Sequence, residues 1–134
     1  LLVALFFTKL SLPITSVLII FFFAVLTSLV FALAGLLNGI YAKSIDGINI
    51  VPTFVLTPLV YLGGIFYSVH SLPAWWQALT YANPLFYLIN GFRYGFLGIT
   101  DVSLIISIGM LIGMIAALLG INWYLIRTGL GLKQ

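Results

Sequence analysis

The sequence predicts an all-α polytopic membrane protein, and three observations lead to this fold class. Hydrophobic residues make up 63% of the 134 residues and charged residues only 5%, with a mean hydropathy of +1.29. A soluble domain carries about 25% charged residues. Three uncharged stretches are long enough to cross a hydrocarbon core, which takes about 20 helical residues. Their continuous apolar character excludes a membrane β-barrel, whose strands alternate in polarity.

The expected architecture is three full transmembrane helices, a re-entrant or interfacial helical hairpin and the tail of a truncated helix. Residues 1–134 would form the C-terminal part of a single transmembrane domain. The predicted spans are 14–37, 48–69 and 102–126, and the predicted hairpin covers 71–97. Residues 1–7 are apolar but too few to cross a bilayer, so we expect them to end a helix that begins upstream.

The second predicted span contains two prolines. Pro52 and Pro58 each remove a backbone donor and are expected to kink the helix. Thr53 and Thr57 are close enough in sequence to satisfy carbonyls that the prolines free. The glycine pair at 63–64 is expected to loosen the far end of this helix.

The stretch at 71–97 is uncharged over most of its length, but it does not read as one spanning helix. Asn83 precedes Pro84 near its middle, and a residue before proline is pushed out of the helical region. We therefore expect two short helices, at about 73–82 and 84–96. Trp75, Trp76 and Tyr81 are amphipathic rings of the kind that settle at headgroup depth.

The positions of the few basic residues favour one topology of the chain in the membrane. If the hairpin does not cross, Lys43, Arg127 and Lys133 share one side and face Lys9 and Arg93. If it crosses, Lys43 and Arg93 face the other three. The first arrangement keeps the basic residues of the polar loop and the C-terminus together, which favours a cytoplasmic position for both.

Glycine spacing and one aspartate suggest local roles. Asp101 is placed to cap the start of the third span. Small residues four apart allow close helix packing in lipid, and the sequence places such pairs at Gly35 and Gly39 and at Gly109 and Gly113.

Several kinds of chemistry are missing. The chain has no cysteine, no phosphate-binding loop and no basic stripe for nucleic acid. The only carboxylates, Asp46 and Asp101, fall in loops, whereas ion-coupled carriers usually hold an ionisable group at membrane depth. His70 has no other histidine or cysteine to share a metal. We therefore expect no catalytic, cofactor-binding or metal-binding residue on this chain.

Arg93 leaves three alternatives open. It could extend to lipid phosphates, bond backbone carbonyls and so fix the hairpin, or contact a substrate.

An ordered string of motifs resembles the C-terminal signature of ABC-2-type permeases. Its pieces are Gly63-Gly64-Ile65-Phe66-Tyr67-Ser68, Leu72-Pro73-Ala74-Trp75-Trp76, Asn83-Pro84 and Gly91-Phe92-Arg93-Tyr94-Gly95-Phe96-Leu97-Gly98. The similarity continues upstream through Leu36-Leu37-Asn38-Gly39 and Val51-Pro52-Thr53-Phe54, and covers roughly 31–134.

The resemblance implies the transmembrane subunit of an ATP-driven exporter in a bacterial inner membrane. Two permeases would pair as a homodimer, surrounded by membrane lipid, and separate ATP-binding subunits would hold ATP and Mg. The permease itself would then not be an enzyme. The hairpin would lie on the extracytoplasmic side. Family substrates include amphipathic drugs, lipids and polysaccharide precursors. The alternative is a non-transport membrane subunit for assembly or anchoring.

The resemblance also assigns residues. The hairpin signature, with a structural or gating role, comprises Gly63, Gly64, Leu72, Pro73, Trp76, Asn83, Pro84, Arg93 and Gly98. A possible ATPase-facing loop comprises Asn38, Lys43 and Asp46.

Overall fold

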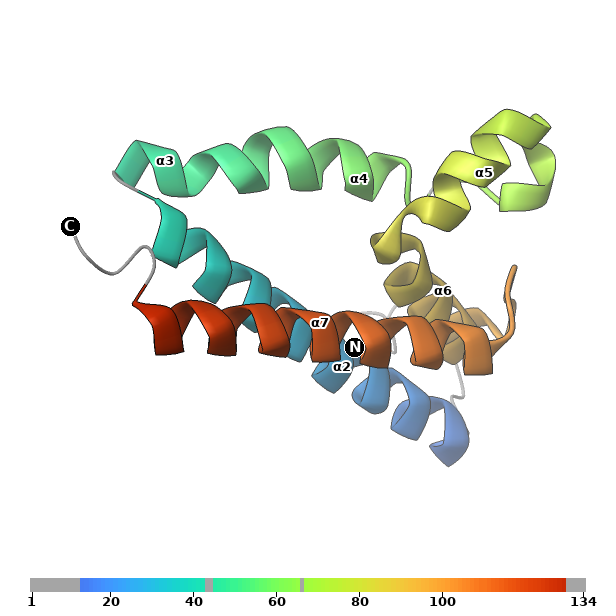
Figure 1. The fold of residues 1–134 in the computed structure, drawn as a ribbon. Coiled ribbons are helices and arrows are strands. Elements are labelled where there is room, and N and C mark those ends of the chain that lie inside the picture. Colours follow the sequence, from blue (N-terminus) through green and yellow to red (C-terminus); the bar gives the residue numbers. More distant parts are fainter. Residues whose placement is uncertain (1–12, 43–44, 66, 130–134) are drawn as a thin grey trace.

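The computed structural model describes residues 13–42, 45–65 and 67–129, and all regular elements within these ranges are helices (Figure 1). The all-α prediction is confirmed for this part of the chain. The expected helix tail at 1–7 lies outside the described residues, as do Lys9, Lys43 and Lys133.

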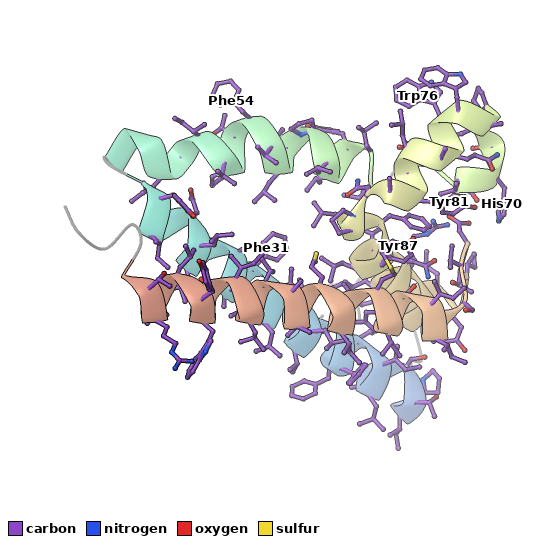
Figure 2. The ribbon with its side chains drawn as sticks, viewed as in Figure 1. Phe31, Phe54, His70, Trp76, Tyr81 and Tyr87 are labelled. Atoms are coloured by element: carbon purple, nitrogen blue, oxygen red, sulfur yellow. The ribbon has the colours of Figure 1, made fainter. Side chains whose placement is uncertain are left out.

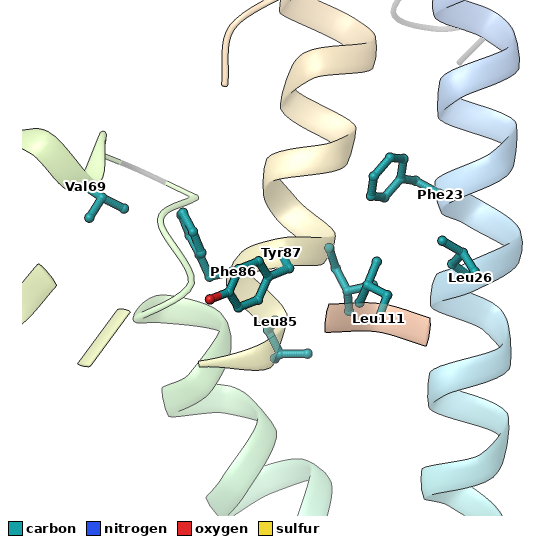
Figure 3. Packing of buried hydrophobic residues seen from close by; sticks show 8 residues of the cluster. Phe23, Leu26, Val69, Leu85, Phe86, Tyr87 and Leu111 are labelled. Carbon is teal, nitrogen blue, oxygen red and sulfur yellow. The ribbon is translucent and has the colours of Figure 1, made fainter. Parts of the chain in front are cut away.

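Among the described residues, two helices are long and apolar enough to cross a membrane. They are α2 (Ile14–Tyr41) and α7 (Leu104–Thr128), which correspond to the first and third predicted spans. Both pack against α6 (Pro84–Leu97) and against each other. The three helices contribute most of the hydrophobic core, where Phe23, Phe86 and Leu111 are almost completely buried (Figure 3).

The second predicted span is shorter than expected. A continuous helical run consists of α3 (Ile45–Ile50), the π-helical η1 (Val51–Leu56) and α4 (Thr57–Tyr61), and it ends well before the predicted limit at residue 69. The reason is the glycine pair, because Gly64 adopts φ +80°, which turns the chain out of the helix. The pair terminates the helix rather than loosening it.

This run, which we call the proline helix (45–61), is loosely packed. No side chain of η1 or α4 is buried, and Phe54 is 73% exposed. In Figure 2 the Phe54 side chain points away from the rest of the molecule. The proline helix therefore makes little of the core, unlike α2 and α7.

The predicted pair of short helices is present. After the short η2 (Val69–Ser71), α5 (Ala74–Ala82) and α6 follow one another, separated by Asn83 in an extended conformation. Pro84 occupies the first position of α6, where its missing N–H is harmless. The expected boundary at Asn83-Pro84 therefore matches the structure.

The close helix approach occurs at glycines other than those singled out. A Cβ added at Gly91 would lie 2.1 Å from the Phe23 ring, and one at Gly95 would lie 2.5 Å from Ile20 Cγ1. These two α6 glycines let α2 come close. No heavy atom lies within 4 Å of such a Cβ at the four glycines chosen by their spacing, so they make no close helix contact inside the described chain: Gly35, Gly39, Gly109 and Gly113.

We expect Gly91→Ala to destabilise the folded protein. The added methyl group overlaps the Phe23 ring, and overpacking of this kind costs about 1–3 kcal/mol. Thermal unfolding in detergent measures the loss. Gly120→Ala is the matched control, because nothing lies within 4 Å of a Cβ there. Equal unfolding temperatures for the two variants would show that α2 and α6 are not in close contact.

Candidate functional site

A cluster of polar side chains joins the hairpin to the start of α7, and Asp101 is at its centre. The Asp101 carboxylate accepts hydrogen bonds from the Ser68 hydroxyl at 2.7 Å and from the Val69 N–H at 3.3 Å. Arg93 Nη1 donates to Asp101 Oδ2 at 2.7 Å in an ion pair. The Asp101 side chain is only 4% exposed and that of Arg93 is 20% exposed. One carboxylate thus connects three segments of the chain.

Asp101 is held in its charged form. Burial alone raises the pKa of this carboxyl, but the hydrogen bonds from Ser68, Arg93 and the Val69 N–H, together with the positive charge of Arg93, outweigh it. The pKa therefore lies below its ordinary value of 3.8. The ion pair is intact at neutral pH.

Asn90, from the middle of α6, continues the same cluster inward. Its side chain is fully buried. Its Nδ2 donates to the Val102 carbonyl at 2.8 Å and to Ser107 Oγ at 2.9 Å. Its Oδ1 accepts from the Thr100 hydroxyl at 2.9 Å and from the Asp101 N–H at 3.0 Å. A single amide therefore fixes the connection between α6 and α7.

The structure corrects the role expected for Asp101. The cap of α7 is Ser103, whose Oγ accepts from the Ile106 N–H at 3.4 Å. Ser103 directly precedes the first helical residue, whereas the Asp101 carboxylate is already engaged by Arg93.

Of the alternatives for Arg93, the structure shows an anchoring contact, but to a carboxylate instead of backbone carbonyls. Asn90 was missed by the sequence analysis. Its signal was an uncharged polar residue in an otherwise apolar segment, which in lipid calls for internal partners.

Asn83 forms the joint between the proline helix and the hairpin. Its Nδ2 donates to the Leu59 carbonyl at 2.6 Å, and its Oδ1 accepts from the Leu85 N–H at 3.0 Å. The first bond satisfies a carbonyl in the last turn of α4, and the second caps α6. Gly64 lies near this contact: a Cβ added at Gly64 would be 3.6 Å from the Phe86 ring.

The other hairpin residues are spread over its outer surface. Pro73 precedes α5, and the Leu72 carbonyl accepts from Gln77 Nε2 at 2.9 Å. Trp76 lines a cavity of about 240 Å³ with Tyr61, Leu62, Tyr67 and Leu72. Figure 2 shows Trp76, Tyr81 and His70 gathered at this end of the molecule.

Two further glycines of the signature lie at helix ends. Gly98 ends α6 with φ +69°, a conformation that suits glycine. Gly63 follows α4, and a Cβ there would meet the end of the Ile89 side chain at 2.5 Å.

The proposed ATPase-facing loop lies at the opposite end. Figure 1 places the end of α2, the start of α3 and the end of α7 together there, away from the hairpin. Asn38 is on the last turn of α2, and Asp46 is in the first turn of α3. Lys43 is outside the described residues. A contact with an ATPase stays a prediction for these residues.

His70 lies exposed on η2. Among the residues that the structure describes, no group of three or more His, Cys, Asp or Glu side chains could hold a metal ion.

Comparison with known proteins decides the family. The sequence model of a family described as "ABC-2 type transporter" matches residues 1–97. The chain belongs to the ABC-2 type transporter family. The match includes α2, the proline helix and the whole segment 71–97, so the resemblance found from the motifs is confirmed. With its long apolar helices, this family member is a multi-pass membrane protein.

Its relatives are permeases. The chain is 57% identical over 110 residues to the inner membrane transport permease YadH of Escherichia coli (strain K12), covering 82% of this chain and 43% of YadH. It matches the YadH of Shigella flexneri to the same extent. It is 30% identical over 115 residues to the daunorubicin resistance ABC transporter permease protein DrrB1 of Streptomyces coeruleorubidus, covering 84% and 38%. The chain thus spans less than half the length of these curated relatives. No solved structure matches.

We expect the Arg93–Asp101 pair to stabilise the folded permease as a unit. Arg93→Ala and Asp101→Asn should each cost about 1–3 kcal/mol, because each leaves a largely buried partner without its charged hydrogen bond. The double variant should cost less than the sum. Acidification should mimic Asp101→Asn, because a lowered folded-state pKa gives stability that is present above the ordinary value of 3.8 and lost as the pH falls through the folded value.

Thermal unfolding of the purified permease from pH 7 downward measures both effects. Arg127→Ala, at the other end of α7, is the matched control for removing a positive charge. Strict additivity of the two single variants, or an Asp101→Asn variant as acid-sensitive as the parent, would contradict the pairing.

Proposed function

We propose that the chain is part of the membrane-spanning permease subunit of an ATP-driven exporter located in the bacterial inner membrane. The observation that carries the proposal is the family match over residues 1–97, which ends with α6, the helix that the Asn90 and Arg93 contacts join to the start of α7. The names of the relatives, which are transport permeases, agree with this function.

The energy source would be a separate ATP-binding subunit. The sequence contains no phosphate-binding loop of its own, which supports this division of labour. We propose that two permeases pair and that ATP-binding subunits contact the end of the molecule where α2 ends and α3 begins. Asn38 and Asp46 lie at that end. ATP and Mg would be bound by the partner.

The cargo we propose is amphipathic. The surface of the proline helix is apolar and largely exposed, and its most exposed aromatic residues are Phe54 and Tyr61. The relative named for daunorubicin resistance supports a drug-like cargo. Lipids and polysaccharide precursors are the other cargoes that we propose.

The topology we propose has three membrane crossings and an extracytoplasmic hairpin. The crossings are α2, the proline helix and α7. Supporting this arrangement, the hairpin and the proposed ATPase-facing end lie at opposite ends of the molecule (Figure 1). The proline helix would cross with the help of the turn at Leu62 and the segment that follows it, since it is shorter than α2 and α7.

The decisive experiment uses the full-length permease. Affinity purification from membranes should recover an ATP-binding subunit, and inside-out vesicles should accumulate an amphipathic dye only with hydrolysable ATP. A permease that is recovered alone and moves the dye without nucleotide would rule out ATP-driven transport. An anchoring subunit would be recovered with other proteins yet support no accumulation.

The topology is tested by thiol labelling. Cysteines introduced as Ser44→Cys and Ser71→Cys in a cysteine-free permease should react with an impermeant reagent from opposite sides of the membrane. Ser71 is exposed on η2 at the hairpin end. Labelling of both positions from one side would show that the proline helix does not cross.

A further inference from the structure

Packing holds the proline helix only loosely, through Leu56, Leu59 and Val60, which lie partly buried against the core. No side chain of η1 or α4 is buried, and a cavity of about 240 Å³ separates η1 from α2. Ala34 and Gly35 line this cavity from α2, and Val51 and Pro52 line it from η1. Since the facing side chains do not fill the space, a different interaction must fix the distance between the two helices.

That interaction lies at Pro52. If the hydrogen-bond pattern of α3 continued past Ile50, the N–H of residue 52 would donate to the carbonyl of Ile48, but proline has no N–H. Asn38 supplies a donor from the neighbouring helix, since its Nδ2 lies 2.8 Å from the Ile48 carbonyl oxygen. Ile48 is 45% exposed in the described chain, and an unpaired backbone carbonyl is costly in a lipid environment.

The same device holds the other end of the proline helix. Asn83 Nδ2 donates to the Leu59 carbonyl at 2.6 Å, in the last turn of α4. The proline helix is therefore attached at both ends by side-chain amides that come from outside it. Between these attachments, Thr57 Oγ1 donates back to the Pro52 carbonyl at 3.2 Å.

We propose that Asn38 is a positioning residue for the proline helix. It replaces the donor that Pro52 lacks and so sets the spacing between α2 and η1. The transport consequence rests on the proposed function, but the spacing itself does not. If Asn38 acted only as part of an ATPase-facing loop, its importance would be independent of residue 52.

The experiment uses the full-length permease, freed of other cysteines and assembled with its ATP-binding subunit. One cysteine pair, Ala34→Cys with Val51→Cys, reports the spacing through the rate of cross-linking by a short bifunctional thiol reagent in membranes. Both positions line the cavity. The variants are Asn38→Leu, Pro52→Ala and their combination. Asn49→Leu, an exposed asparagine on α3, is the matched control.

Asn38→Leu should change the cross-linking rate by about fivefold, the effect of one lost hydrogen bond on an equilibrium constant. Adding Pro52→Ala should restore most of the parent rate, because an alanine at this position offers the Ile48 carbonyl an N–H within its own helix. Asn49→Leu should leave the rate unchanged. ATP-dependent transport should follow the same order.

Equal effects of Asn38→Leu with proline or alanine at position 52 would overturn the proposal, and so would no effect at all. If Asn38→Leu fails to accumulate, accumulation becomes the readout: recovery by Pro52→Ala supports the proposal, and equal loss in both overturns it. Absence of transport in the parent would refute the proposed function alone, because the cross-linking rates are read without transport.

Discussion

The arrangement of this chain depends on asparagine amides that donate to backbone carbonyls of other segments. Asn38 bonds Ile48, Asn83 bonds Leu59, Asn90 bonds Val102 and Asn122 bonds Leu33, all at 3.0 Å or less. In lipid there is no hydrophobic driving force that brings apolar helices together, so their association depends on packing and on interhelical hydrogen bonds. An amide is suited to the task because it carries two donors and no charge that must be removed from water.

These contacts differ in where they lie. Asn90 and Asn122 are buried, Asn90 between α6 and the start of α7, and Asn122 between α7 and α2. Asn38 and Asn83 instead hold the two ends of the proline helix, which has no fully buried side chain in η1 or α4 and packs against the core only through the partly buried Leu56, Leu59 and Val60. Asn122 Oδ1 is buried without a partner among the described residues, so this contact is only half satisfied.

Much of the fold could be predicted from the sequence because lipid restricts the possibilities. Long apolar stretches predicted α2 and α7, and Asn83-Pro84 predicted the boundary between α5 and α6, since proline affects its neighbour locally. The predicted end of the second span was wrong, because composition measures hydrophobicity and not the φ angle that Gly64 adopts. The glycine spacing did not indicate the close contacts within the described chain, because it identifies small residues but not which helix face meets a neighbour.

The candidate site was predictable only in outline. Arg93 stood out as a charge among aromatic residues, and anchoring was one of its alternatives. Its acceptor is eight residues away across the α6–α7 connection, and that connection has no periodicity from which its path could be read. The Asn90 side chain makes more hydrogen bonds than the side chain of any residue of the predicted signature. A single polar residue in an apolar stretch, however, does not indicate which groups it bonds.

The contact between Gly91 and Phe23 also bears on how the sequence can vary. The ring occupies the volume that any side chain at position 91 would need. A larger residue at 91 is therefore compatible with this fold only together with a smaller one at 23, although the two positions are far apart along the chain. Homologous sequences should carry this reciprocity as a pair of positions that change together, with their combined side-chain volume held nearly constant.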